Sequence, residues 1–226
     1  MVVQRLLSRG HTVRVLARGT RPGLAMATET VPGSVLRPET LPAACGGVDA
    51  IIHLVGIISE VGDQTFERVH TEGTRNILQA AQSEGLRRFI HMSALGTRPN
   101  AVARYHRSKW MAEEAVRSSG LDWTIFRPSL IYGPGDGPFD RVIRMILEAT
   151  GRPRGLVHLP LPIARLQAGI LEKVFPGMLN QAPPLNRDQI QMLQEDNVGD
   201  PGPASEVFGF IPRSFEEGLA RLFLRG

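Results

Sequence analysis

The chain has 226 residues, of which 42% are hydrophobic and 21% charged, the composition of an ordinary globular protein able to form one large domain. Its net charge of +4 comes from basic residues scattered along the sequence and not from a basic stripe with interleaved aromatic residues, which argues against nucleic-acid binding. No stretch approaches the roughly 18 apolar residues of a transmembrane helix, and the start lacks the apolar core of a signal peptide, so we expect a cytoplasmic protein.

The first part of the chain alternates helical and strand patterns. Apolar spacing predicts a helix over 2–9, a strand over 11–19, a brief helix in 38–47 and an apolar strand over 48–56. The single cysteine, Cys45, has no partner for an internal disulfide and no neighbouring His and Asp, so we interpret it as structural.

The alternation continues towards the middle of the chain. We predict a long helix over 64–83 that ends at Gly85, a strand over 87–93, a helix that runs to Gly120 and a strand over 121–128. Short connections between alternating strands and helices are typical of a doubly wound parallel sheet with helices on both faces, an α/β fold of the Rossmann type. Such sheets bind ligands at the carboxyl ends of their strands, where Gly56, Ser93 and Pro128 fall.

The last third is rich in helical patterns separated by prolines. Helices are predicted over 139–151, 161–175 and 186–198, and a capping box of Ser214 and Glu217 begins a closing helix. We therefore divide the chain into a nucleotide-binding domain, 1–137, and a small, mostly helical lobe, 138–226. The lobe would close a substrate cleft over the sheet or dock on a partner.

Tyr105 and Lys109 are the residues on which we expect the chemistry to depend. Four residues apart on a helix, they project from the same face, so the ammonium can favour the phenolate and bring the tyrosine pKa nearer to neutrality. Such a tyrosine can exchange a proton with an alcohol or carbonyl oxygen while a hydride moves at carbon. Ser93, at the end of the preceding strand, could hold the same oxygen.

The pair is unusual for this composition. Among the basic residues only Lys109 and Lys173 are lysines, and Tyr105 and Tyr132 are the only tyrosines, so chance gives such a pair with a probability of roughly 2%. The alternative is an accidental pair on a solvated helix face. A lysine retained beside a tyrosine in a chain that otherwise uses arginine favours the chemical interpretation.

The segments DAIIHLVG, HTEGTRNILQAA, FIHMSALG, YHRSK and FRPSLIYGPGD together resemble those of the extended and atypical short-chain dehydrogenase/reductases, a group of NAD-dependent epimerase/dehydratase-like proteins. The later segments NRDQIQMLQEDNV and FGFIPRSFEEGL are most similar to those of the respiratory complex I 39 kDa subunit family and its bacterial relatives. The resemblance covers nearly the whole chain.

The resemblance implies roles for particular residues. Tyr105 would be the acid/base, Lys109 its partner and a ribose ligand, and Ser93 the substrate-oxygen donor, although many relatives place that hydroxyl where this chain has Ala94. The remaining cofactor-binding positions would be Leu54, Val55 and Gly56 along the dinucleotide and Pro128 and Ser129 against the nicotinamide.

Arg18 bears on which dinucleotide is bound. It follows the first predicted strand, where relatives that prefer NAD usually have an acidic residue, and an arginine can hold a 2′-phosphate through two hydrogen bonds. We therefore expect NADP(H), with NAD(H) as the alternative, and no metal. Arg18 could also be one surface arginine among many.

Two departures from the family pattern are expected to matter. The chain starts within the helix that normally follows a strand and a Gly-rich turn, so a place for a central strand would stay open between two strands. Either the gene begins upstream or the pyrophosphate site is absent. A second departure lies near 145–147, where a family segment with a strand is missing.

Three functions therefore stay open at this point. The chain could be an oxidoreductase or epimerase acting on a hydroxyl or carbonyl substrate, an NADP(H)-binding accessory subunit of a respiratory complex I-like assembly, or an inactive truncated relative. The expected partners are a dinucleotide, a small-molecule substrate and, in the second case, complex subunits that would hold the protein at the periphery of the inner membrane. Fold analogy cannot choose among these, because function depends on the site.

Overall fold

The computed structural model describes residues 2–19, 28–128, 147, 159–195, 199–211 and 217. The part that leads up to residue 128 alternates strands and helices, and we refer to it as the sheet half. Its elements are α1 (Val2–Leu7), β1 (Val13–Ala17), β2 (Thr28–Pro32), a 3₁₀ turn (Pro38–Thr40), α2 (Pro42–Cys45), β3 (Ala50–His53), a π-helical turn (Glu67–Glu72), α3 (Gly73–Ser83), β4 (Arg88–Met92), α4 (Arg104–Arg117) and β5 (Asp122–Phe126).

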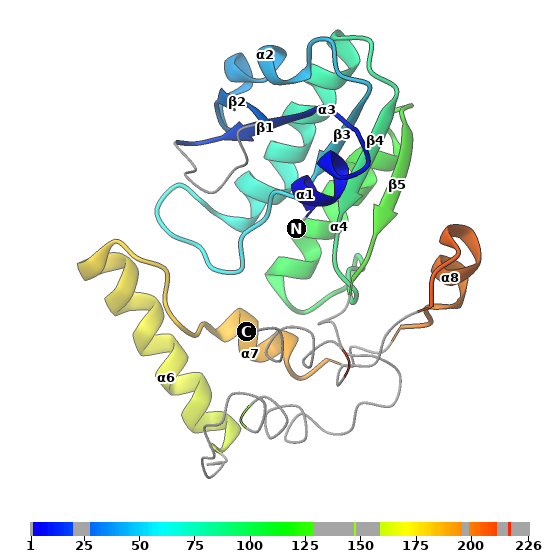
Figure 1. The fold of residues 1–226 in the computed structure, drawn as a ribbon. Coiled ribbons are helices and arrows are strands. Elements are labelled where there is room, and N and C mark those ends of the chain that lie inside the picture. Colours follow the sequence, from blue (N-terminus) through cyan, green and yellow to red (C-terminus); the bar gives the residue numbers. More distant parts are fainter. Residues whose placement is uncertain are drawn as a thin grey trace.

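All the described strand pairs are parallel. β1 pairs with β2, and β3, β4 and β5 form a second sheet in that order, with Ile52 opposite Ile90 and Ile90 opposite Thr124. In Figure 1, α1 lies in front of the strands, whereas α3 and α4 lie behind them. The predicted fold, a Rossmann-type parallel α/β arrangement with helices on both faces, is therefore confirmed.

The parallel strands form two separate sheets, divided between β1 and β3, where the sequence predicts an open place for a central strand. Among the described residues, no strand joins β1 to β3, so each of these strands has one edge without a neighbouring strand. In the strand order of this fold a central strand lies between them. Backbone groups on such edges are available for pairing with a further strand.

The core of the sheet half lies between the strands and the helices behind them. The long helix predicted over 64–83 has an apolar face that is buried: Phe66, Val69, Ile77, Leu78 and Ala81 are all at most 5% exposed. Ile77, Leu78 and Ala81 are part of a continuous apolar core, whose buried members around α3 are Leu41, Cys45, Ile77, Leu78, Ala80, Ala81, Leu86, Phe89 and Val116. Cys45 is thus a core residue, as predicted, and burial raises the pKa of its thiol.

Two glycines shape the long helix. A Cβ atom at Gly73 would lie 2.8 Å from Cγ2 of Val35, so the absence of a side chain lets the helix approach this loop closely. Gly85 has a φ of +71°, the left-handed conformation that ends helices, and it lies where the sequence predicts the helix to stop.

Several expected boundaries differ from the structure. The strand predicted over 48–56 is shorter, because β3 ends at His53 and the three residues after it are exposed. β2 was not expected: its sequence, TETVP, is mostly polar and exposed, so it lacks the apolar run of a buried strand. The helix over 139–151, the junction at 145–147 and the capping box of Ser214 lie outside the described residues, except for residues 147 and 217.

The described part from residue 159 onward, which we call the C-terminal lobe, is helical. It contains α6 (Leu161–Val174), a π-helical turn (Phe175–Leu179), α7 (Arg187–Met192) and α8 (Gly202–Phe208). Figure 1 shows α7 beside the end of the sheet half from which α4 starts, with α6 further out. No helix within the described ranges is long and apolar enough to cross a membrane.

Candidate functional site

α4 brings Lys109 to the carboxyl end of β3. The side chain is only 4% exposed, and its Nζ donates a hydrogen bond of 3.0 Å to the backbone oxygen of Met92 at the end of β4. A Cβ atom at Gly56 would lie 3.2 Å from the same Nζ. A side chain at position 56 would therefore crowd the amine, so a glycine there keeps the amine and the backbone in close contact.

Burial changes the charge balance of Lys109. The loss of hydration lowers the pKa of its amine to about 8, although the nearby carboxylate of Glu113 opposes this shift. The amine is therefore still largely protonated at neutral pH, but it can give up its proton more easily than a surface lysine. A buried, polarising cation thus lies at the rim of the parallel sheet.

Tyr105 lies one turn nearer to the start of α4 and is partly exposed. Its ring packs edge-on against Phe66 and His70, with centroids 5.9 Å and 5.2 Å away. Burial raises the pKa of its phenol, in the direction opposite to the one expected from the Tyr-x-x-x-Lys spacing. The expectation considered only the charge of Lys109, whereas here the loss of hydration dominates.

Ser93 immediately follows β4 and is 3% exposed. Its hydroxyl donates to Oγ1 of Thr97 at 3.3 Å, and Ser93 is one of the neighbours that lower the pKa of the Glu113 carboxyl group. The neighbouring Ala94 is partly exposed. The Ser93 hydroxyl is therefore directed into the protein in this structure, and it would have to change rotamer to reach a substrate.

Glu113 is a buried member of the site that sequence reasoning missed. Its carboxylate is fully buried and accepts hydrogen bonds from Arg127, which follows β5, and from Arg117 on α4. Burial alone would raise the pKa of Glu113, but these hydrogen bonds and the one with Ser93 lower it. The signal in the sequence is a second interval of four residues, from Lys109 to Glu113, on the same helix face.

His70 is the second residue that sequence reasoning missed. Its Nε2 accepts a hydrogen bond of 3.0 Å from the backbone N–H of Ile57, which fixes the proton on Nδ1, 2.8 Å from Oγ of Ser108. The Ser108 hydroxyl in turn donates to the backbone oxygen of Tyr105. Burial and the charge of Lys109 lower the pKa of His70 to about 3, so the ring is neutral. It connects the loop after β3 to α4.

The expected cofactor-binding residues of the β3 loop lie at the strand end. Leu54 and Val55 are 45% and 38% exposed, which is unusual for apolar residues directly after a strand of a parallel sheet. With Gly56 they form a narrow apolar surface beside Lys109. This composition suits the face of an aromatic ring or a ribose, with Lys109 as the polar contact.

The other predicted cofactor residues lie at neighbouring strand ends. Arg18 directly follows β1, is exposed, and donates to the side-chain oxygen of Gln64. Pro128 lies two residues beyond β5, and its carbonyl oxygen accepts a 2.9 Å hydrogen bond from the N–H of Leu95. Ser129 lies outside the described residues. The described candidates thus all lie at the carboxyl ends of parallel strands.

A cavity of about 500 Å³ lies where the sheet half meets the C-terminal lobe. Phe66, which packs against Tyr105, lines it together with Arg104 at the start of α4. The lobe contributes mostly polar and charged side chains, among them Glu172, Asn186, Arg187, Asp188 and Gln191. Tyr105 does not line the cavity itself but packs against Phe66, which does, so the cavity is a candidate substrate space near the start of α4.

Comparison with known proteins agrees with this arrangement. A family model described as NAD(P)H-binding matches residues 1–146. The chain is 32% identical over 179 residues to a ceramide reductase of Caulobacter vibrioides, covering 70% of this chain and 56% of the relative. It therefore spans a little over half the length of that relative.

Two further similarities bear on the expected family. A mitochondrial 40 kDa subunit of NADH-ubiquinone oxidoreductase from Neurospora crassa is 30% identical over 105 residues, 46% of this chain and 28% of that protein. The fold is shared with the NADPH-dependent quinone oxidoreductase QOR2 of Escherichia coli, solved with NADPH, at a TM-score of 0.64 and 14% identity over 98% of this chain and 95% of that one. With more than half of its length matched by the family model, the chain belongs to the NAD(P)H-binding family, and its fold is of the Rossmann type.

Proposed function

We propose that this protein is an NAD(P)(H)-dependent oxidoreductase or epimerase of the short-chain dehydrogenase/reductase type that acts on a hydroxyl or carbonyl group. The observation that carries the proposal is the position of Lys109, a buried amine with a pKa of about 8 beside Gly56, one helical turn from Tyr105. Few structural roles need a cation at such a place, because burying one costs free energy.

The residues at the sheet rim fit a dinucleotide. Gly56 has no side chain, which leaves room for the Lys109 amine to approach the backbone. The exposed Leu54 and Val55 offer an apolar surface next to Gly56. Lys109 would bind a ribose hydroxyl, and Pro128 and Ser129 would flank the nicotinamide. A bound NAD(P)H would supply a hydride to the carbonyl carbon of the substrate.

Tyr105 would complete the reduction by giving its phenolic proton to the carbonyl oxygen. In the reverse reaction, the oxidation of an alcohol, the phenolate would take the proton of the substrate hydroxyl. Its raised pKa keeps the phenol protonated before substrate binds, which is the form needed for reduction. The charge on Lys109 would stabilise the phenolate that follows. Ser93 would hold the substrate oxygen if its hydroxyl turned away from Thr97.

We further propose that the preferred cofactor is NADP(H). Arg18 is exposed at the end of β1, and its guanidinium could exchange the hydrogen bond with Gln64 for a 2′-phosphate. Arg18→Gln should weaken NADPH binding by roughly tenfold or more and leave NADH binding unchanged, since one charge-assisted hydrogen bond contributes about 1.5–3 kcal/mol. An equal loss of affinity for NADPH and NADH would contradict the proposed preference for NADP(H).

A second candidate is an NADP(H)-binding accessory subunit of a respiratory complex, without turnover. It is favoured by the similarity to the 40 kDa subunit and by the inward direction of the Ser93 hydroxyl. In that case the dinucleotide would stabilise the fold, and the Tyr105 hydroxyl would be dispensable.

The experiment follows NADPH binding through the fluorescence of Trp110, which is next to Lys109 in the sequence, and NADPH oxidation with a panel of ketones and aldehydes. Tyr105→Phe should lower turnover by about 10²–10⁴-fold while NADPH affinity changes little, because the phenol acts only on the substrate oxygen. Binding without turnover of any carbonyl would favour the accessory subunit. An unchanged rate in Tyr105→Phe would refute the proposed role of Tyr105.

A further inference from the structure

The helix that carries the Tyr-Lys pair has no cap of its own. The residue at the N-cap of α4 is Ala103, which is fully buried and has no side-chain acceptor for the free N–H groups of the first turn. Helices normally satisfy these groups with Ser, Thr, Asp or Asn at this position. The start of α4 therefore depends on an acceptor from elsewhere.

That acceptor is Asp188 of the C-terminal lobe. Its Oδ1 lies 2.7 Å from the backbone nitrogen of Arg104 and its Oδ2 lies 2.9 Å from that of Tyr105. Each carboxylate oxygen thus accepts one backbone N–H, and the negative charge lies at the positive end of the helix, where it is favourable. Tyr105 is held through its own backbone by a residue 83 positions later in the chain.

The residues beside Asp188 fix it in place. Asn186 caps α7 in a box with Gln189, and its Nδ2 donates to the oxygen of Ile58 at 3.0 Å. Arg187 pairs with Glu172 of α6 at 2.7 Å. Three consecutive side chains, 186–188, thus bind the β3 loop, α6 and α4 respectively.

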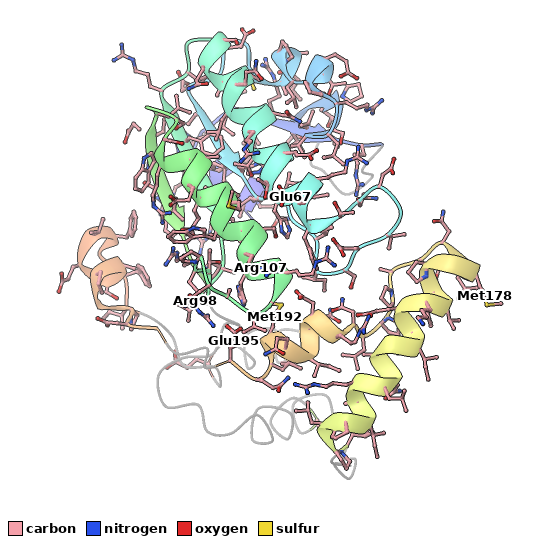
Figure 2. The ribbon with its side chains drawn as sticks, turned by 180° about the vertical axis from the view of Figure 1, so that it is seen from behind. Glu67, Arg98, Arg107, Met178, Met192 and Glu195 are labelled. Atoms are coloured by element: carbon pink, nitrogen blue, oxygen red, sulfur yellow. The ribbon has the colours of Figure 1, made fainter. Side chains whose placement is uncertain are left out.

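A further ion pair holds the other end of α7. Arg98, in the loop after β4, bonds Glu195 at 2.8 Å, and Figure 2 shows the two side chains meeting where the lobe joins the sheet half. The lobe is therefore attached on both sides of the Asp188 contact. A shift of α7 would therefore carry the carboxylate away from the start of α4.

We propose that Asp188 is a positioning residue for Tyr105, and that the C-terminal lobe uses it to align the phenol with a substrate bound in the cavity beneath α7. This proposal rests on the proposed function, since it assigns Asp188 a part in proton transfer by Tyr105. Asp188 touches no reacting atom. Its contacts with α4 are confined to the first turn, although its side chain also lines the cavity.

The contacts within α4 separate its effect from cofactor binding. Lys109 lies one turn further along and is held by the Met92 oxygen, in a part of α4 whose neighbours, Ala112 and Val116, are fully buried. Losing Asp188 would therefore loosen the Tyr105 turn and leave the Lys109 turn in place. Turnover should fall, whereas NADPH affinity should persist.

The test compares Asp188→Ala with Asp200→Ala in the full chain. Asp200 is a matched control, because its carboxylate also accepts a helix-start N–H, that of Gly202 at 2.8 Å, but at α8. Asp188→Ala should lower kcat by roughly 10-fold or more with NADPH affinity within about threefold, and Asp188→Asn should recover part of the loss, because its amide oxygen still accepts one N–H. Asp200→Ala should match the unaltered protein.

A second readout needs no substrate. In a Tyr132→Phe background Tyr105 is the single tyrosine, so its ionisation can be followed by ultraviolet difference absorbance. Because burial raises the pKa of Tyr105, loosening its turn in Asp188→Ala should lower that pKa towards 10.0, and Asp200→Ala should leave it unchanged.

The two readouts keep the proposals apart. If the unaltered protein reduces no carbonyl, the proposed function fails, while the tyrosine titration still reports on the contact between Asp188 and Tyr105. If Asp188→Ala keeps both kcat and the Tyr105 titration of the unaltered protein, the positioning role is refuted.

Discussion

The sheet half and the C-terminal lobe are stabilised by different kinds of contact. The sheet half has a continuous apolar core, in which Leu41, Phe89 and Val116 are fully buried. In the described part of the C-terminal lobe, Ala168, Pro183 and Ile190 are the only buried apolar residues, and polar contacts such as those of Asn186 and Asp188 attach it to the sheet half. We therefore expect stability to depend chiefly on the sheet half, and the lobe to loosen without unfolding of the chain.

The candidate site lies on the boundary between these two parts. Lys109 belongs to the sheet half, where its side chain is buried. Tyr105 lies in the first turn of α4, which Asp188 of the lobe contacts. Substitutions in the two parts should therefore separate folding, cofactor binding and proton transfer.

Glu113→Ala should have the largest effect on stability. It removes a fully buried carboxylate and leaves Arg127 and Arg117 without their shared acceptor. We expect a loss of about 3–5 kcal/mol in the free energy of unfolding, measured by urea denaturation. The control is Glu114→Ala, next along α4, whose side chain is 49% exposed and should cost less than about 1 kcal/mol. Equal losses would contradict the buried role.

Acid should destabilise the sheet half through its buried histidines. His70 and His91 have pKa values lowered by burial from 6.5 to about 3 and about 4, so they stay neutral in the folded state while the unfolded chain takes up protons. The contribution of these neutral histidines to the free energy of unfolding is fully present above pH 6.5. It is lost as the pH falls towards the two lowered pKa values, by about 1.4 kcal/mol per pH unit for each histidine.

Urea unfolding at a series of pH values measures this slope. A free energy of unfolding that stays constant from pH 7 to pH 5 would show that the histidines are not buried as described.

Lys109→Met should stabilise the protein while removing its function. Burial lowers the pKa of the amine from 10.5 to about 8, so the folded state carries an unfavourable charge at pH 7. After allowing for the lost hydrogen bond to Met92, we expect a gain of about 2 kcal/mol. The gain should shrink as the pH rises from about 8 to 10.5, because the amine then becomes neutral in the folded state. Thermal unfolding at pH 7 and pH 9.5 measures this gain. A melting temperature of the variant below that of the unaltered protein at pH 7 would contradict the prediction.

Asn186→Ala should have the smallest effect. It removes the capping box of α7 and the hydrogen bond to the oxygen of Ile58, at a cost of about 1 kcal/mol. Because Asn186 contacts the β3 loop at Ile58, beyond the residues expected to bind the dinucleotide, NADPH binding at the sheet rim should be unchanged. A loss above about 3 kcal/mol would mean that the lobe contributes to the core, contrary to the comparison above.

Local patterns in the sequence predicted most of the sheet half. The apolar face of Phe66, Ile77 and Leu78 follows from helical spacing, and Gly85 marks the end of that helix. The interval between Tyr105 and Lys109 pointed to the candidate site, because it depends on one helix alone. These features are local, so a single stretch of sequence contains them.

Features that depend on distant contacts could not be predicted in this way. Nothing near Ala103 indicates that its helix is capped by Asp188, since the two lie in separate patterns. The direction of the Tyr105 pKa shift depends on burial against Phe66 and His70, which only the fold brings together. β2 was missed because its exposed polar residues lack the apolar pattern of a buried strand.

The most direct test of the account is the NADPH affinity of the unaltered protein and of Lys109→Met, measured by calorimetric titration at pH 7. The account predicts binding to the unaltered chain and an affinity at least roughly tenfold weaker in the variant, because the amine is the polar contact beside Gly56. Equal affinities in the two proteins would contradict the placement of the dinucleotide against Lys109.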